Sequence, residues 1–245
     1  EQTYGRFFEQ VRMALETPPA VKSITTDFEQ SAINVSKLLF PKATNHGCYF
    51  HFRQCIYRRI QRSGLKKRYD TDVELQHQLK LLVAVAFVPV EYVVRAFEVV
   101  LDEKIISHEG KPIVDYFEDT WIGRLERRER RRPLFEHGLW NFYQQTLEGK
   151  QKTNNNLVEG WHRSLINQFH GKNPSIWKFI EGLMREQSMT ELKLNQQLSG
   201  QQSRSNSKRK TENRRLLLLV ANFYSDFQDT QEFFISYLKG VASAI

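Results

Sequence analysis

The first 65 residues alternate between helical and extended patterns, and this alternation constrains the fold more than any other feature. Apolar residues recur at helical spacing in the opening segment, and Thr17-Pro18-Pro19 ends it. Two short segments that follow have the composition of strands. The expected elements are a helix at 3–16, a strand at 21–26, a helix at 28–40, a strand at 47–50 and a basic helix at 51–65. This order is typical of an α/β fold.

Residues 70–150 have a different pattern. Apolar side chains form helical stripes at 75–86 and 94–101, and Pro89 separates them. The run from Arg124 to Arg132 contains six arginines. Its glutamates are spaced to pair with arginines three or four residues later, which favours a solvent-exposed helix over a DNA-backbone contact. The sequence therefore predicts a mainly helical block without core strands.

The rest of the chain divides by composition. Residues 151–194 contain helical patterns, 195–215 are Gln/Ser-rich and then basic, and 216–245 are apolar enough for a last helix. We expect a flexible basic linker at 195–215 and a C-terminal helix at 216–245. The basic residues at 208–210, together with Arg214 and Arg215, fit a nuclear-import signal or a DNA-contacting tail.

Charge and composition limit the class of protein. The chain has 36 Lys and Arg against 28 Asp and Glu, which gives a net charge of +8, so a polyanionic partner is the first expectation. An apolar share of 40% supports a folded core and excludes general disorder. Two cysteines exclude a disulfide scaffold. The longest apolar run, Leu81–Val90, is too short to span a bilayer, so no membrane partner is expected.

Two polar positions follow the expected strands. Asp27 ends the first strand and could hold a metal ion, although with Gln30 it also fits a capping box, the explanation favoured by these residues alone. Cys48 and His51 form a C-x-x-H pair after the second strand, and Cys55 follows. Zinc needs four ligands, and the second pair usual in zinc fingers is absent from the sequence. A partly buried cysteine with a hydrogen-bonded histidine is therefore favoured over a zinc site.

The segment from Thr153 to His162 is the most unusual in composition. Glu159, His162 and Arg163 share one helical face at i, i+3 and i+4, a set that suits a metal-and-phosphate site. The preceding asparagines with Glu159 equally fit a capping box, and the spacing does not separate these alternatives.

Arginines are concentrated on the expected helix at 51–65. Arg58 and Arg62 lie one turn apart, with Arg53 and Arg59 nearby, so phosphates could bind there. A solvated helix face explains the same pattern equally well.

The order and combination of several motifs resemble Mutator-like (MULE) transposases. The resemblance runs from Tyr4 to Gln187 and rests on Ile24–Glu29, Phe40-Pro41, Gly47–Phe52, Ala86–Pro89, Trp140-Asn141, Thr153–Asn155, Glu159–His162 and Pro174–Trp177. It implies an RNase H-like core at 1–69 that is completed at 151–194 and interrupted by a helical insertion at 70–150. It also implies that the core is truncated at its N-terminus.

The resemblance assigns roles to residues of this chain. Asp27 corresponds to the second catalytic acid, Glu159 to the third, and Cys48 with His51 to the C-x-x-H motif of the family. Asn155 and His162 would lie near the site, and Arg163, like Arg53, Arg58, Arg59 and Arg62, would bind DNA. The implied activity is cleavage and transfer of DNA strands with two Mg²⁺ or Mn²⁺ ions in the complete protein.

No Asp precedes Asp27, so the first acid is expected upstream, and this chain alone is expected to be an inactive fragment. DNA, a homo-oligomer assembled on DNA and a nuclear location are the implied partners and compartment. Two alternatives stay open: a transposase-derived DNA-binding transcription regulator without catalysis, and a helical scaffold for protein interaction.

Overall fold

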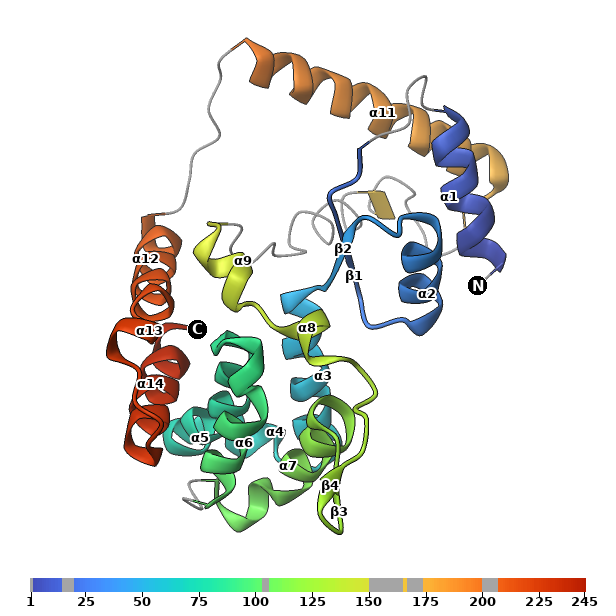
Figure 1. The fold of residues 1–245 in the computed structure, drawn as a ribbon. Coiled ribbons are helices and arrows are strands. Elements are labelled where there is room, and N and C mark those ends of the chain that lie inside the picture. Colours follow the sequence, from blue (N-terminus) through green and yellow to red (C-terminus); the bar gives the residue numbers. More distant parts are fainter. Residues whose placement is uncertain (1, 15–19, 103–105, 150–164, 167–173, 200–206) are drawn as a thin grey trace. The chain divides into compact units, whose positions relative to one another are not determined.

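The computed structural model describes residues 2–14, 20–102, 106–149, 165–166, 174–199 and 207–245. The chain divides into two units, one formed by 1–152 with 211–245 and the other by 153–210. Residues 1–69 and 70–149 both belong to the first unit, and their assignment to a core and an insertion stays a prediction. The structure is mainly helical with few strands, as the sequence predicts (Figure 1).

The N-terminal part of the first unit has the expected order of helix, strand, helix, strand and helix. Strand β1 pairs in parallel with β2, from Ser23 opposite Thr44 to Thr26 opposite Gly47. The second strand lies earlier than the sequence predicts, because Cys48 is the N-cap of the next helix. The elements are α1 (Gln2–Ala14), β1 (Ser23–Thr26), α2 (Gln30–Leu39), β2 (Thr44–Gly47) and α3 (Tyr49–Arg62).

Residues 66–147 form the expected helical block. Pro89 separates α5 from α6, since 3₁₀ turns η1 (Val85–Phe87) and η2 (Val90–Tyr92) flank it. The remaining elements are α4 (Lys66–Thr71), α5 (Val73–Ala84), α6 (Val93–Asp102), the 3₁₀ turn η3 (His108–Gly110), α7 (Lys111–Phe117), the π-helical turn η4 (Glu118–Ile122), α8 (His137–Trp140) and α9 (Tyr143–Leu147). The described residues of this block contribute no strand to the β1–β2 sheet.

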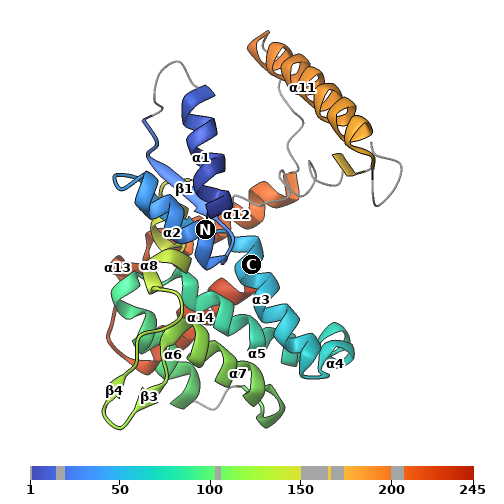
Figure 2. The same cartoon turned by 90° about the vertical axis from the view of Figure 1, so that its right-hand side faces the viewer.

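The arginine-rich run at 124–132 is a β-hairpin, so the exposed helix predicted there is wrong. Strands β3 (Leu125–Glu126) and β4 (Glu129–Arg130) pair antiparallel, and Figures 1 and 2 both show them away from β1 and β2. Arg127 has a φ of 61° at the turn, a left-handed conformation that a continuous helix does not contain. Gly123 has a φ of 93°, and a side chain there would collide with the backbone of the returning strand.

Arg130 stabilises the base of this hairpin through ion pairs and a hydrogen bond. Its guanidinium pairs with Glu118 at 2.8 Å and Glu98 at 3.0 Å and donates to the Gly123 carbonyl at 2.8 Å. The side chain is only 14% exposed, so these partners compensate a charge that would be costly to bury alone. The helical ion pairs expected for Arg130 are therefore replaced by partners from α6 and η4.

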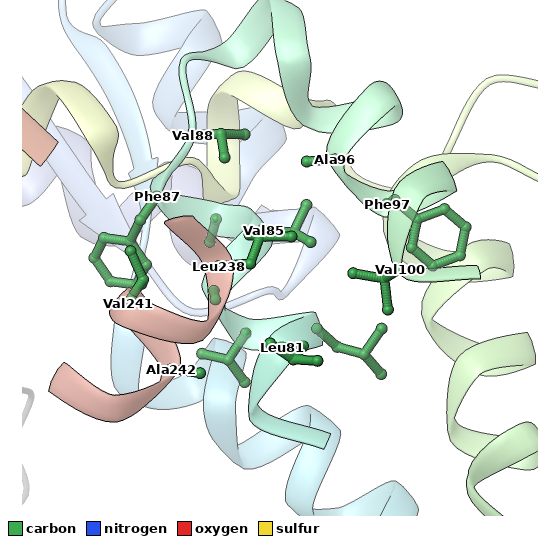
Figure 3. Close-up of a cluster of buried hydrophobic side chains, with 14 of the residues drawn as sticks. Leu81, Val85, Phe87, Val88, Ala96, Phe97, Val100, Leu238, Val241 and Ala242 are labelled. Atoms are coloured by element: carbon green, nitrogen blue, oxygen red, sulfur yellow. The ribbon is translucent and has the colours of Figure 1, made fainter. Parts of the chain in front are cut away.

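Three helices lie in the described part of the segment where the sequence predicts a linker and one helix, and residues 200–206 of the expected linker lie outside the described residues. Helix α12 (Ser207–Ala221) begins inside the expected linker, and α13 (Phe223–Asp226) and α14 (Gln231–Ala244) follow. Helix α14 packs on α5, and Figure 3 shows Leu238 and Val241 beside Val85 and Phe87. The Tyr237 hydroxyl donates to the Phe87 carbonyl at 2.6 Å. The C-terminal helix is thus part of the central core.

The second unit contributes one long described helix. Helix α11 (Ile176–Leu198) begins soon after Pro174, as the sequence predicts. It also includes the start of the expected linker at 195. No helix in the described ranges has the length and apolar character needed to cross a membrane.

An aromatic cluster joins β1 to the helical block. Phe52 of α3 stacks on Trp140 at 5.3 Å and meets Trp121 edge-on at 4.9 Å. Phe28, just after β1, meets Trp121 at 4.8 Å and Phe135 at 5.1 Å. Such contacts add to the stability gained from burial of the rings.

Gly47 makes room for Phe28. A Cβ at this position would lie 2.6 Å from Phe28 Cε1, closer still to Cζ, and 3.1 Å from the Leu139 carbonyl oxygen. We expect Gly47→Ala to lower the free energy of unfolding by about 1–3 kcal/mol, because Phe28 has to move. Urea unfolding measures this. Gly138→Ala is the matched control, since nothing lies within 4 Å of its Cβ position, and equal effects would contradict the steric explanation.

The Tyr237–Phe87 hydrogen bond gives a second prediction. Tyr237→Phe leaves the buried Phe87 carbonyl without this donor, so we expect the free energy of unfolding to fall by about 1–3 kcal/mol. Tyr224→Phe is the control, because its hydroxyl bonds Glu91 at an exposed site. A larger loss in Tyr224→Phe than in Tyr237→Phe during denaturant titration would show that the C-terminal helix is held by other contacts.

Candidate functional site

Asp27 lies at the carboxyl ends of the two parallel strands. It follows Thr26 of β1 directly, and the amide of Cys48 donates to the Thr26 carbonyl at 2.8 Å. The C-x-x-H motif therefore begins beside Asp27, although 20 positions separate the two in sequence order. Ligands of α/β proteins commonly bind outside this end of parallel strands.

The Asp27 side chain is exposed and does not cap the next helix. The N-cap of α2 is Glu29, and its side chain makes no cap hydrogen bond, so the capping box of Asp27 and Gln30 is wrong. Phe28 turns inward at the strand end, and α2 begins only after it. Among the described residues, the Asp27 carboxylate has no hydrogen-bond or ion-pair partner. It is therefore available to a ligand.

Glu29 has a different role from its neighbour Asp27. Its carboxylate accepts a hydrogen bond from the Tyr4 hydroxyl at 2.6 Å, and this bond is the main reason why the pKa of Tyr4 is raised. The contact ties α1 to the start of α2. Of the two acids beside β1, Asp27 is the one without such a structural partner.

The C-x-x-H motif lies in the first turn of α3. Cys48 is buried, with 2% of its surface exposed, and its carbonyl accepts the first helical hydrogen bond from Phe52. His51 is half-buried and its ring meets Phe50 edge-on at 5.4 Å. Within the described ranges, no three His, Cys, Asp or Glu side chains are grouped to hold a metal ion.

The pKa of the Cys55 thiol depends on Asp27 and on Arg58. Burial raises the pKa of its thiol, Arg58 lowers this pKa, and the negative charge of Asp27 raises it. Asp27 from the strand end and Arg58 from the middle of α3 therefore both lie near Cys55. The candidate catalytic acid and the basic helix share one neighbourhood.

A single face of α3 carries these groups. A helix turns 100° per residue, so five side chains fall within a narrow sector, which we call the α3 stripe. The members of the α3 stripe are Cys48, His51, Cys55, Arg58 and Arg62. Arg58 and Arg62 are exposed and form no ion pair with any described residue. The stripe thus runs from the strand end to two uncompensated cations.

Arg53 lies on another face of α3, whereas Arg59 borders the α3 stripe, one turn after Cys55. The guanidinium of Arg53 lies 5.7 Å from the centre of the Tyr49 ring. Arg59 donates to the Pro112 carbonyl at 3.2 Å and lies 5.5 Å from the centre of the Tyr116 ring. Arg59 therefore ties α3 to α7. Both remain predicted DNA contacts, but each already has a partner within the protein.

The other predicted site residues lie outside the described residues. They are Asn155, Glu159, His162 and Arg163. The convergence of Glu159 with Asp27 stays a prediction.

Sequence patterns gave no signal for a cleft of about 420 Å³ beside α2. Lys37 and Arg132 both pair with Glu136 there, and they hold the pKa of its carboxyl below the usual range. Lys37 and Glu136 are 99 positions apart, so no local spacing could bring them together. Asp27 and Cys48 are not among the lining residues, and the cleft is separate from the α3 stripe.

Asp27→Asn tests the position of Asp27. We expect a change below about 0.5 kcal/mol in the free energy of unfolding, because the carboxylate is exposed and unpaired. The same change removes the charge that raises the pKa of Cys55, so alkylation of Cys55 at a fixed pH should become faster. The pH profile of alkylation, followed by mass spectrometry, measures this. Asp229→Asn is the control, because Asp229 is an exposed acid that pairs with Arg95. An unchanged pH profile of Cys55 alkylation in Asp27→Asn would contradict the placement of Asp27 near Cys55.

Comparison of the chain with known proteins identifies no relative. No family model, no curated protein and no solved structure matches the chain. The function is therefore argued from the chain's own residues and from the resemblance of their motifs.

Proposed function

We propose that this chain is part of the catalytic core of a Mutator-like DNA transposase. One observation supports this above the others: the exposed, unpaired Asp27 stands beside the C-x-x-H motif at the shared carboxyl ends of two parallel strands. In the resemblance the C-x-x-H motif follows the second catalytic acid along the sequence. Their sequence spacing alone does not make them neighbours, and the pairing of Cys48 with Thr26 does.

The chemistry of the proposed reaction explains the choice of residues. Strand cleavage and strand transfer are in-line displacements at phosphorus, with water or a DNA 3′-hydroxyl as nucleophile. Two metal ions about 3.5–4 Å apart hold the attacking and leaving oxygens. Mg²⁺ and Mn²⁺ favour carboxylate oxygens as ligands. Asp27 and Glu159 would each hold one ion, and a further Asp would bridge both.

Residues 1–26 contain no Asp that could bridge the ions. Two carboxylates would bind the metal weakly and position it poorly. We therefore propose that the 245-residue chain does not cleave DNA by itself and that the bridging Asp belongs to an upstream strand. An RNase H-like arrangement of the core, assembly on DNA as a homo-oligomer and a nuclear location belong to the same proposal.

The basic helix supports DNA as the substrate. The segment from Tyr49 to Arg68 contains seven Lys and Arg residues and no carboxylate. Arg58 and Arg62 have no internal counter-ion among the described residues. This feature would serve a transposase and equally a DNA-binding regulator without catalysis, so cleavage has to distinguish the two.

Nicking of supercoiled plasmid tests the proposal. The 245-residue chain should bind DNA but should not nick it with Mg²⁺ or Mn²⁺. A longer protein that adds a strand-borne upstream Asp should nick, because the bridging ligand is then present. Asp27→Asn and Glu159→Gln in the longer protein should each abolish nicking and leave DNA binding intact.

EDTA is the control for metal dependence in this assay. Nicking that survives Asp27→Asn would contradict the assigned role of this acid. DNA binding by the longer protein without any nicking would favour the regulator. Metal-dependent nicking by the 245-residue chain itself would show that another residue supplies the third carboxylate.

A further inference from the structure

The α3 stripe links the candidate catalytic acid to two free cations. At 1.5 Å per residue, Arg62 lies about 16 Å along the helix from His51. Asp27 adjoins the beginning of the stripe through Cys48 and Cys55. The distance from the acid to the last cation is therefore on the scale of a few nucleotides, not of one bound ion.

Arg58 and Arg62 differ from the other cations of this region. Lys66 pairs with Asp70 at 3.0 Å, and Arg68 pairs with Asp72 and Glu109. Arg59 is held by Pro112 and Tyr116. Arg58 and Arg62 have no such partners among the described residues, and both point from the same face of α3. Exposed Lys67 of α4 also has no ion pair among the described residues, but it lies outside α3. On α3 itself, the two arginines without an internal partner among these residues are arranged in a line.

The spacing of these two arginines suits one nucleic-acid strand. They are four residues apart, so their positions differ by about 6 Å along the axis and by a small rotation. Two guanidinium groups in such a line can each bind a phosphate, since phosphates repeat regularly along one strand. Side chains that contact phosphates position a strand without reading its bases.

We propose that the α3 stripe is a track for one DNA strand that leads to Asp27. Arg58 and Arg62 bind neighbouring phosphates of that strand and fix its direction along α3. This inference rests on the proposed function and adds the path of the substrate. Arg53 lies on another face of α3, and Arg59, which borders the stripe, is held by Pro112 and Tyr116. The basic residues of α3 are therefore divided between substrate binding and internal support.

Cys55 provides a direct readout of this track. Its thiol is half-buried on the stripe, between His51 and Arg58. A strand bound along the stripe would cover it and slow its alkylation. Cys48 is buried, so Cys55 is the thiol that reagents reach more easily.

Alkylation of Cys55 by iodoacetamide, with and without a duplex of arbitrary sequence, tests the track. The reaction is run at alkaline pH, because burial raises the pKa of the thiol. We expect the duplex to slow alkylation several-fold at low salt and to lose this effect at high salt. Each variant is compared with itself without DNA, because Arg58 also affects the thiol directly.

Affinity measured against salt provides the second readout. The Arg58→Gln and Arg62→Gln double variant should make the slope of log affinity against log salt less negative by up to about two units and should abolish protection of Cys55. Lys67→Gln removes an exposed charge from the neighbouring α4 and should leave protection intact.

The outcomes separate this inference from the proposed function. DNA binding with a normal salt slope but without protection of Cys55 would overturn the track and leave DNA as the substrate. An unchanged slope in the double variant would do the same. Absence of any DNA binding by the unmodified chain would overturn both proposals.

Discussion

The packing of Phe28 over Gly47 is the contact on which the arrangement of the candidate site depends. Phe28 leaves the end of β1 and enters a cluster with Trp121 and Phe135, far along the chain. It passes β2 only because Gly47 has no side chain. Since Phe28 turns inward, its neighbour Asp27 faces solvent. The same residue pair therefore anchors the sheet to the helical block and exposes the carboxylate.

Local patterns predict most helices but fail where partners are distant. Periodicity locates α2 and α3 because each buries one face, and it also locates α1, whose apolar residues recur at helical spacing although none of them is buried. The predicted strand at 47–50 lies later than β2, because aromatic Tyr49 and Phe50 suit a strand equally well in the sequence, whereas in the structure Cys48 is the N-cap of α3. The sequence predicts one helix at 216–245, whereas the structure has parts of three, and the packing of α14 on α5 is also a distant contact. Tyr237 bonds Phe87 from 150 positions away, and no local spacing encodes that contact.

The candidate site was predictable only in part. The residue types at Asp27, Cys48 and His51 indicate a possible metal or catalytic site. A capping box formed by Asp27 and Gln30 also explains the Asp27 residue type. The structure removes that alternative, because the N-cap of α2 is Glu29 and no described side chain makes a cap hydrogen bond there. No pattern in the sequence could place Asp27 near Cys55, since that neighbourhood depends on the pairing of β1 with β2.

The two arginine-rich segments show what the fold adds to a count of charges. Both segments are rich in arginine in the sequence, although the spacing of the glutamates at 124–132 already favours ion pairs there over a DNA contact. In the hairpin, Arg124 and Arg131 pair with Asp119, while Arg130 pairs with Glu98 and Glu118. On α3, Arg58 and Arg62 meet no such acid among the described residues. At the base of the hairpin a phosphate would have to displace existing ion pairs, and only Arg127 and Arg128 at its turn have none among the described residues. On α3 a phosphate would displace no ion pair of Arg58 or Arg62, and these two cations lie on the same helix as the motif beside Asp27.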